Sequence, residues 1–184
     1  MIYVWLLVAA GFGLYSRARA PDWRGMRPAL TFSLLVGAAW LPVAVLSPVS
    51  ATVLIWVMLL FALVALIRAP VLDRWYARGP VALYAGWLTA AACVALGFVL
   101  GGYGVVSLVV AALACLNLAI LIGFVVLFLV PDCAEYGLSL CWALVAVVVN
   151  NGMDQPTVSA FALGGAVFAL GGAARSALRQ AATR

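Results

Sequence analysis

The stretch that decides the fold is "VALYAGWLTAAACVALGFVL", residues 81–100, which contains no charged side chain. A helix of about 20 apolar residues is long enough to cross the hydrocarbon core of a bilayer, which is about 30 Å thick. The first two turns of this stretch also carry Tyr84 and Trp87. These aromatics have two explanations at this stage: a ligand-binding surface, or the ring of amphipathic side chains that membrane helices carry near their ends.

The composition of the whole chain extends this prediction. The 184 residues are 68% hydrophobic and only 8% charged, with a mean hydropathy of +1.24. Soluble domains are roughly half apolar and about a quarter charged, so the charges here are too few to cover a water-soluble surface. We therefore expect a single all-α transmembrane domain over residues 1–184.

Seven apolar runs predict about seven helices. They occupy residues 2–15, 29–46, 51–67, 81–100, 105–130, 136–149 and 157–174. The first and sixth runs are short for a full crossing. Most prolines fall at run boundaries, but Pro42 lies inside the second run and should kink the end of that helix.

The basic residues, all ten of them arginine, indicate the orientation. They lie in the connections 17–27 and 68–78 and in the tail 175–184. Seven crossings put all of them on one side of the membrane, whereas six crossings would split them between both sides. Because arginine-rich short loops mark the cytoplasmic face, we expect the amino terminus outside and the carboxyl terminus in the cytoplasm.

The net charge of +5 requires no nucleic-acid partner, because the arginines are spread over three segments as orientation demands. The expected partner is the lipid bilayer, whose anionic headgroups attract arginine. A lysine-free chain rich in alanine, valine and arginine indicates a GC-rich genome. We therefore expect a multi-pass protein of a bacterial inner membrane.

Missing residues exclude several kinds of chemistry. The chain has no lysine for a Schiff base and no histidine, the commonest metal ligand. Its four cysteines show no Cys-x-x-Cys spacing, so no metal site is predicted. Cys93 and Cys115 fall inside apolar runs, where we expect small buried hydrophobes rather than a disulfide.

The apolar runs also contain no acidic or basic residue, since all five acids are expected in loops: Asp22, Asp73, Asp132, Glu135 and Asp154. Ion pumps, proton-coupled transporters and voltage sensors place ionisable groups inside the membrane, so this absence argues against those classes. The serines and threonines of the runs have no base or metal beside them. We therefore predict no catalytic residues and no enzyme activity.

Asn117 is the one strongly polar side chain expected at mid-depth. In hydrocarbon its amide needs a partner. That partner is either a backbone carbonyl or a hydroxyl on a neighbouring helix, or a ligand.

Small residues recur at helical spacing in three places: Gly97 with Gly101, Ala160 with Gly164, and Gly165 with Ala169 and Ala173. Such stripes let helix backbones approach closely. They predict close packing either within one bundle or across a homodimer interface.

Most of the seven tryptophans are expected at the membrane interfaces, where Trp and Tyr concentrate. We place Trp5, Trp40 and Trp56 near the outer interface and Trp23 and Trp75 in the arginine-bearing connections. Trp87 and Trp142 are expected one to two turns deeper.

Trp87 shares one face of its predicted helix with Pro80, Tyr84, Ala91 and Val94. Small residues beside Tyr84 and Trp87 would leave a flat aromatic wall with a shallow recess, which suits a planar apolar ligand. From the residues alone, this wall and the interfacial ring remain alternatives.

The stretch "PVALYAGWLTAAACVALGF", residues 80–98, resembles a helix of the tryptophan-rich sensory protein (TspO/MBR, translocator) family, which starts with a proline and carries a Tyr, a Trp and then small residues. "VWLLVAAGFGLYSR", residues 4–17, is similar to the second helix of that family, and "LTFSLLVGAAWLPVAVL", residues 30–46, to its third. "LSLCWALVAVVVNN", residues 138–151, is similar to a later helix of the longer members, centred on Trp142 and Ala143.

The chain also departs from that family. The family's first helix and the Pro-x-Trp-x-Pro-Pro loop after it have no counterpart, and Gly37 and Ala95 stand where asparagines are expected. Members of the family are associated with tetrapyrroles and sterols. The resemblance implies a pocket lined by four aromatics: Trp5, Trp40, Tyr84 and Trp87.

We therefore expect a sensory or transport-type membrane protein that binds a planar hydrophobic small molecule, such as a porphyrin or haem. Without histidine, stacking rather than iron ligation would hold this tetrapyrrole. The candidate ligand-binding residues are Trp5, Trp40, Tyr84, Trp87, Ala91, Asn117 and Trp142. The alternative is a non-catalytic accessory or scaffold subunit, whose aromatics contact lipid, pigment or the helices of a homodimer or larger membrane complex.

Overall fold

The computed structural model describes residues 2–16, 20–71, 73–130, 132–152 and 154–182. These residues form seven α-helices: α1 (Ile2–Ser16), α2 (Arg27–Leu46), α3 (Pro48–Arg68), α4 (Gly79–Gly102), α5 (Leu108–Leu129), α6 (Ala134–Asn151) and α7 (Pro156–Ala182). In this described part of the chain, α2 to α7 are long and apolar enough to cross a membrane, and α1 is shorter. The predicted all-α, polytopic bundle is confirmed.

The local sequence explains where several helices begin. Pro48 and Pro80 lie in the first two positions of α3 and α4, where a missing N–H breaks no helical hydrogen bond. Ser47 and Ser107 cap α3 and α5, because each side-chain oxygen accepts the backbone N–H three residues further on. Pro42 lies inside α2, where the sequence placed it, and the kink expected there stays a prediction.

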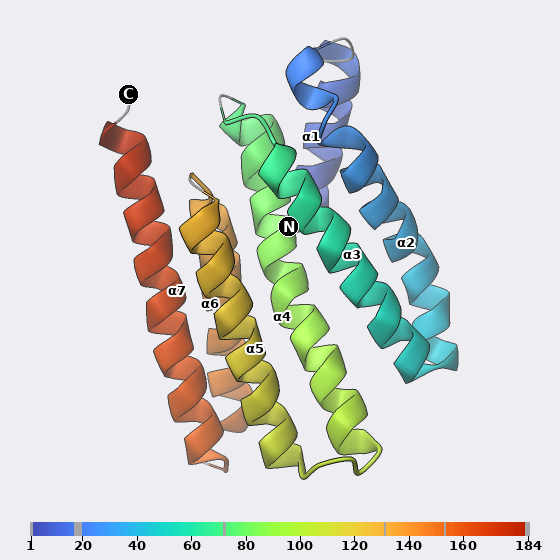
Figure 1. Cartoon of the computed structure of the whole chain (residues 1–184), viewed down its shortest axis with the longest axis vertical. Coiled ribbons are helices and arrows are strands. Elements are labelled where there is room, and N and C mark those ends of the chain that lie inside the picture. The colour runs from blue at the N-terminus through green and yellow to red at the C-terminus, as the bar shows by residue number, and fades with distance from the viewer. Residues whose placement is uncertain (1, 17–19, 72, 131, 153, 183–184) are drawn as a thin grey trace.

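The helix α4 lies at the centre of the bundle (Figure 1). It packs against α3 on one side and against α5 and α6 on the other. The helix α2 packs against α3, and α7 packs against α5 and α6. The stretch of residues 81–100 therefore joins the two halves of the molecule.

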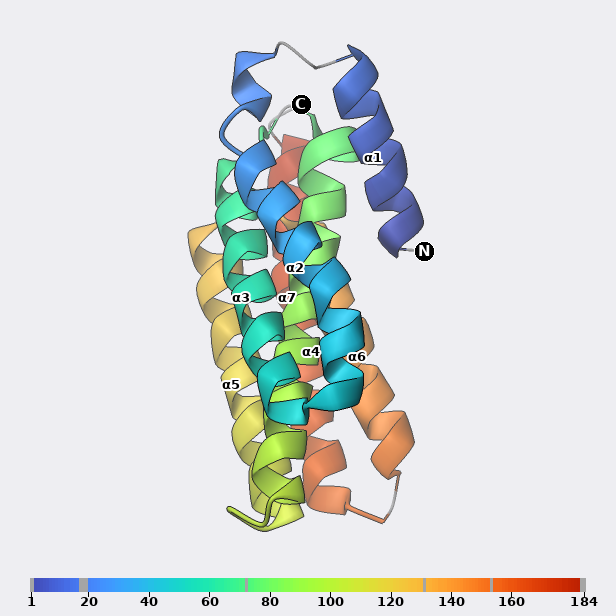
Figure 2. The same ribbon diagram turned by 90° about the vertical axis from the view of Figure 1, so that its right-hand side faces the viewer.

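The arginine-bearing segments lie together at one end of the bundle, which we call the arginine end (Figures 1 and 2). It holds the described parts of the α1–α2 and α3–α4 connections and the last turns of α7, and α1 begins about half-way along the bundle and runs toward it. The expectation that six crossings would split the arginines was wrong. The short helix is α1, so the six long helices are α2 to α7. Six passes return the chain to the end where it started, so the connection before α2 and the last turns of α7 lie at the same end. The orientation in a membrane stays a prediction.

Two buried charged groups strengthen the arginine end. Glu135, expected in a loop, lies instead in the first turn of α6 and is only 8% exposed. Its Oε1 lies 2.6 Å from Arg74 Nε, and the helix N-terminus also favours a carboxylate there. Arg78 is 3% exposed and donates to the carbonyl oxygens of Ala69 and Asp132 at 2.8 and 3.0 Å. The short π-helix η2 (Arg74–Arg78) is thereby joined to the α5–α6 connection.

The helices approach closely where small residues face one another. A Cβ atom added to Gly86 of α4 would lie 2.5 Å from the carbonyl oxygen of Tyr136 on α6. Gly97 and Gly101 face α5, where the nearest atoms include those of Cys115. The Gly-x-x-x-Gly stripe therefore packs inside the bundle, which confirms the first of its two explanations.

The small residues of α7 divide between two faces. Gly165, Ala169 and Ala173 are buried, and Gly165 faces side chains of α5 and α6. Ala160 and Gly164 are exposed, and an added Cβ at Gly164 would meet nothing within 4 Å. The first set packs within the bundle, and the second faces outward.

Candidate functional site

Tyr84, the first aromatic of the predicted wall, is part of the core. Its exposed fraction is 0%, and its hydroxyl lies 3.1 Å from Ser33 Oγ of α2. Ser33 Oγ donates to the carbonyl oxygen of Met58 on α3, so Tyr84 is the donor to Ser33. Thr89 and Tyr136 form a second buried hydroxyl pair at 2.8 Å, between α4 and α6. Both tyrosines therefore tie α4 to its neighbours.

Trp87, one turn further along α4, has a different environment. It is half-buried, as are the small residues Ala90 and Ala91 beside it. Further along the same face, Val94 is 45% exposed and Phe98 74% exposed. We call this the Trp87 face. Its side chains become more exposed toward the end of α4 that lies away from the arginines.

Trp5 and Trp40 lie at opposite ends of the bundle. Trp5 Nε1 donates to the carbonyl oxygen of Trp75 at 2.9 Å, and its ring lies beside Gly79. Its predicted place near the outer interface was wrong, because the short α1 packs against η2 at the arginine end. Trp40 Nε1 donates to Ala51 at 3.1 Å, close to the α2–α3 connection. The structure does not bring Trp5 and Trp40 together.

Asn117 and Trp142 lie on the outer surface of the bundle. Asn117 is exposed, and its Nδ2 donates at 3.0 Å to the carbonyl oxygen of Leu113, one turn back in α5. The expected carbonyl partner is present, but it belongs to the same helix rather than a neighbouring one. Trp142 lies near the middle of α6 and is 77% exposed.

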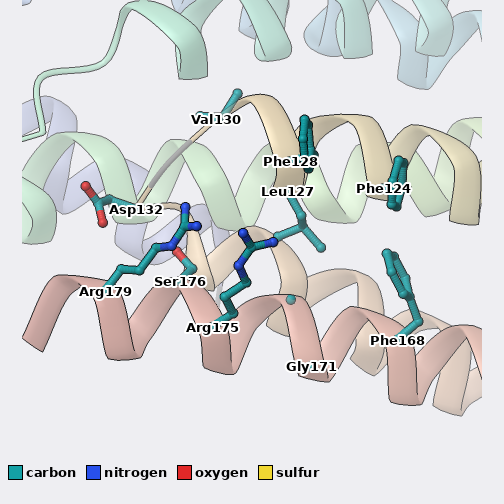
Figure 3. A pocket seen from close by; sticks show the side chains of 11 residues that line it. Phe124, Leu127, Phe128, Val130, Asp132, Phe168, Gly171, Arg175, Ser176 and Arg179 are labelled. Atoms are coloured by element: carbon teal, nitrogen blue, oxygen red, sulfur yellow. The ribbon is translucent and has the colours of Figure 1, made fainter.

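A groove that sequence reasoning missed lies between α5 and α7 near the arginine end (Figure 3). Its volume is ≈ 280 Å³, near the lower limit of ligand sites. Phe124 and Phe128 of α5 and Phe168 of α7 line its apolar part, and Arg175 and Arg179 line its other end. The ring centroid of Phe124 lies 6.0 Å from that of Phe128 and 5.8 Å from that of Phe168. The three rings form one continuous surface across two helices.

Part of this groove was visible in the sequence. Phe124 and Phe128 are four residues apart, as are Arg175 and Arg179, so each pair lies on one face of its helix. The sequence carried no sign that α5 and α7 are neighbours. That adjacency alone brings the two pairs together.

A shallower apolar recess lies between α3 and α4, on the side of Trp56. It is lined by Thr52, Val53, Trp56, Val57, Leu60 and Leu96. The hydroxyl of Thr52 is already bonded to the carbonyl oxygens of Pro48 and Ala95, and no charged side chain among the described residues lines this recess.

Metal ligands do not gather anywhere in the described residues, where no three histidine, cysteine, aspartate or glutamate side chains converge. The four cysteines are free. Cys93 and Cys115 are buried and free, as predicted, and they pack in one apolar cluster with Ala119.

The family model described as TSPO-like protein matches residues 1–175. The chain belongs to the TSPO-like family. Neither a curated protein nor a solved structure matches it. Together with the six long apolar helices, the match makes this TSPO-like chain a multi-pass membrane protein and confirms the resemblance seen in the sequence.

In this TSPO-like chain, Gly37 and Ala95 occupy the positions where the resemblance led us to expect asparagines. A Cβ atom added to Gly37 would lie 2.9 Å from Cε of Met58. The carbonyl oxygen of Ala95 lies 3.4 Å from Thr52 Oγ1, which donates to it. Both positions therefore serve contacts between helices, and a larger side chain at Gly37 would displace Met58.

Proposed function

We propose that this TSPO-like protein binds a planar hydrophobic ligand, a tetrapyrrole such as protoporphyrin or haem, by stacking on Trp87. The proposal rests on the partial exposure of Trp87 beside Ala90 and Ala91. Stacked aromatic rings lie about 4.5–7 Å apart, and small neighbours leave the width that a flat ligand needs.

The coverage of the Trp87 face suggests how such a ligand would enter. Gly79, about two turns before Trp87 along α4 and about 80° away from it around the helix, lies against the Trp5 ring of α1. Val94 and Phe98, at the other end of the face, are open. A ligand would therefore enter sideways from the lipid, with its inner edge toward α1. Since the chain has no histidine, stacking would hold it instead of imidazole ligation.

The proposed setting is a bacterial inner membrane with the arginine end in the cytoplasm. This setting is supported by the described arginines, which all lie at one end, and by the positive-inside rule. The proposed role is non-catalytic.

Titration of the detergent-purified chain with protoporphyrin tests the proposal. The Soret band and tryptophan quenching should both saturate for the unmodified protein. The Trp87→Ala variant should bind about tenfold more weakly, because it loses the stacking surface. The Soret band is the deciding readout, since this variant also loses a fluorophore.

Trp56→Ala is the matched control, because Trp56 is a half-buried tryptophan in the recess between α3 and α4. It should bind protoporphyrin as the unmodified protein does. Binding that never saturates, or that is equally strong in Trp87→Ala, would contradict the proposal.

A second function, as a scaffold or accessory subunit, is favoured by Trp142. A tryptophan near the middle of a membrane helix lies away from the interfaces that this residue prefers, and Trp142 is 77% exposed there. A partner helix or second copy packed on it would account for this position. The mass of the complex in mild detergent should then fall in Trp142→Ala. A constant mass in both proteins would exclude this role for Trp142.

A further inference from the structure

We propose that the α5–α7 groove binds one anionic phospholipid, with its phosphate at Arg175 and Arg179 and an acyl chain along the phenylalanines. This site is separate from the Trp87 face, because it lies between other helices. The proposal rests on an apolar surface and a charged rim that follow one another along the length of the bundle.

The apolar part is open and shaped for a chain. Phe124, Phe128 and Phe168 are 49%, 65% and 37% exposed, so their rings form a surface instead of filling the core. Gly171 also lines the groove, and a Cβ atom added there would meet nothing within 4 Å. The missing side chain keeps the groove open beside the rings.

The charged rim lies at the arginine end of the same groove. Arg175 and Arg179 are one turn apart on α7, and Figure 3 shows both side chains directed across the groove toward α5 and the connection after it. Asp132 borders the rim as well, so two positive charges stand against one negative charge. The described residues that line this rim therefore carry a net positive charge, which attracts an anion. Guanidinium groups bind phosphate oxygens in pairs of hydrogen bonds, which makes arginine well suited to this headgroup.

The order of these parts matches a lipid in a bilayer. The rim lies at the end that holds the other described arginines, at the level where headgroups lie, and the phenylalanines follow toward the middle of the bundle. Basic pockets between transmembrane helices on the cytoplasmic side are a known setting for anionic headgroups. Charge therefore favours phosphatidylglycerol or a similar anionic lipid over a zwitterionic one.

Native mass spectrometry of the detergent-purified chain, titrated with phosphatidylglycerol or phosphatidylcholine, tests the headgroup contacts. The unmodified protein should prefer phosphatidylglycerol. The double variant Arg175→Gln/Arg179→Gln should lose roughly 10- to 30-fold of that preference. The matched control, Arg24→Gln/Arg68→Gln, removes two exposed arginines of the same end outside the groove and should keep the preference.

A second pair of variants tests the acyl chain. Gly171→Leu fills the groove, whereas Gly164→Leu adds the same side chain at an open position of α7 outside it. Phosphatidylglycerol binding should weaken in Gly171→Leu and stay unchanged in Gly164→Leu. Circular dichroism and size-exclusion chromatography of all four variants check that each keeps the fold, so that a loss of binding can be assigned to the groove.

Three outcomes would overturn the proposal. Equal losses in both arginine pairs would show general attraction to the surface. Unchanged binding in Gly171→Leu would show that no chain enters the groove. Displacement of the lipid by protoporphyrin, with protoporphyrin binding lost in Arg175→Gln/Arg179→Gln but kept in Trp87→Ala, would assign the groove to the tetrapyrrole instead.

Discussion

The contacts that the first half of α4 makes with its neighbours and the α5–α7 groove use aromatic residues in opposite ways. Tyr84 and Tyr136 are 0% exposed, and each hydroxyl is paired with a serine or threonine hydroxyl. Phe124 and Phe128 carry no polar atom and lie 49% and 65% exposed beside an arginine rim. A hydroxyl in hydrocarbon needs a partner, which a neighbouring helix supplies, whereas a phenyl ring can face lipid. The presence of an aromatic residue therefore does not locate a binding surface. Whether the ring carries a hydroxyl helps to predict whether it faces a neighbouring helix or the lipid.

The largest expected loss of stability comes from a substitution in the close contact between α4 and α6. Gly86→Leu places a side chain against the Tyr136 carbonyl and against Cβ of Ser139 at 3.1 Å, and a backbone group cannot move aside cheaply. We expect the free energy of unfolding to fall by about 3 kcal/mol or more, measured by SDS-induced unfolding in mixed micelles. Gly164→Leu, with open space around it, should change this free energy by less than about 0.5 kcal/mol. Equal stability of the two variants would mean that α4 and α6 do not approach as closely as the structure shows.

A smaller change sharpens the same contrast by removing only a hydroxyl. Tyr136→Phe should lower the free energy of unfolding by about 0.5–1.5 kcal/mol, because Thr89 Oγ1 keeps its 2.9 Å bond to the carbonyl oxygen of Ala85. Tyr15→Phe is the control, since Tyr15 is 93% exposed, and it should have no measurable effect. Thermal unfolding in detergent gives the same ranking independently. If the two phenylalanine variants unfold alike, the buried hydroxyl pair contributes nothing to stability.

The smallest expected stability effect concerns the groove. Phe128→Ala should change the free energy of unfolding by less than about 0.5 kcal/mol, because the ring is 65% exposed and fills no core space. The same variant should still weaken phosphatidylglycerol binding in the native mass spectrometry titration. A large loss of stability would instead make Phe128 part of the core and remove the distinction between the two regions.

The helices were predictable because hydrocarbon imposes one requirement on every crossing segment. Its backbone must be hydrogen-bonded internally and its side chains must be apolar, so a run such as residues 81–100 leads to a helix, here Gly79–Gly102. The errors came from segments outside this rule. Trp5 was misplaced because α1 is too short to reach the far end. Glu135 was expected in a loop because it precedes the apolar run 136–149, and its buried partner Arg74 is 61 residues away in the sequence.

The candidate sites were less predictable for the same kind of reason. Helical spacing correctly put Tyr84 and Trp87 near one another on α4. Their side chains nevertheless point about 60° apart around the helix axis. Only the tertiary structure shows that α2 and α3 enclose Tyr84. The ligand role stays a prediction for all seven candidate residues: Trp5, Trp40, Tyr84, Trp87, Ala91, Asn117 and Trp142. The groove was not predicted at all, because its residues come from α5 and α7, which the sequence does not place side by side.

By itself the sequence determined a membrane protein of helical hairpins with its arginines gathered at one end, because composition, run length and charge placement act locally along the chain. The tertiary structure alone decided which aromatics are enclosed, which arginine pairs with the buried Glu135, and that Phe124 meets Phe168 beside Arg175. The physical reason is that a helix face is apolar toward lipid and toward a neighbouring helix alike. Hydropathy cannot tell these two surroundings apart, whereas close packing through small residues and paired hydroxyls can.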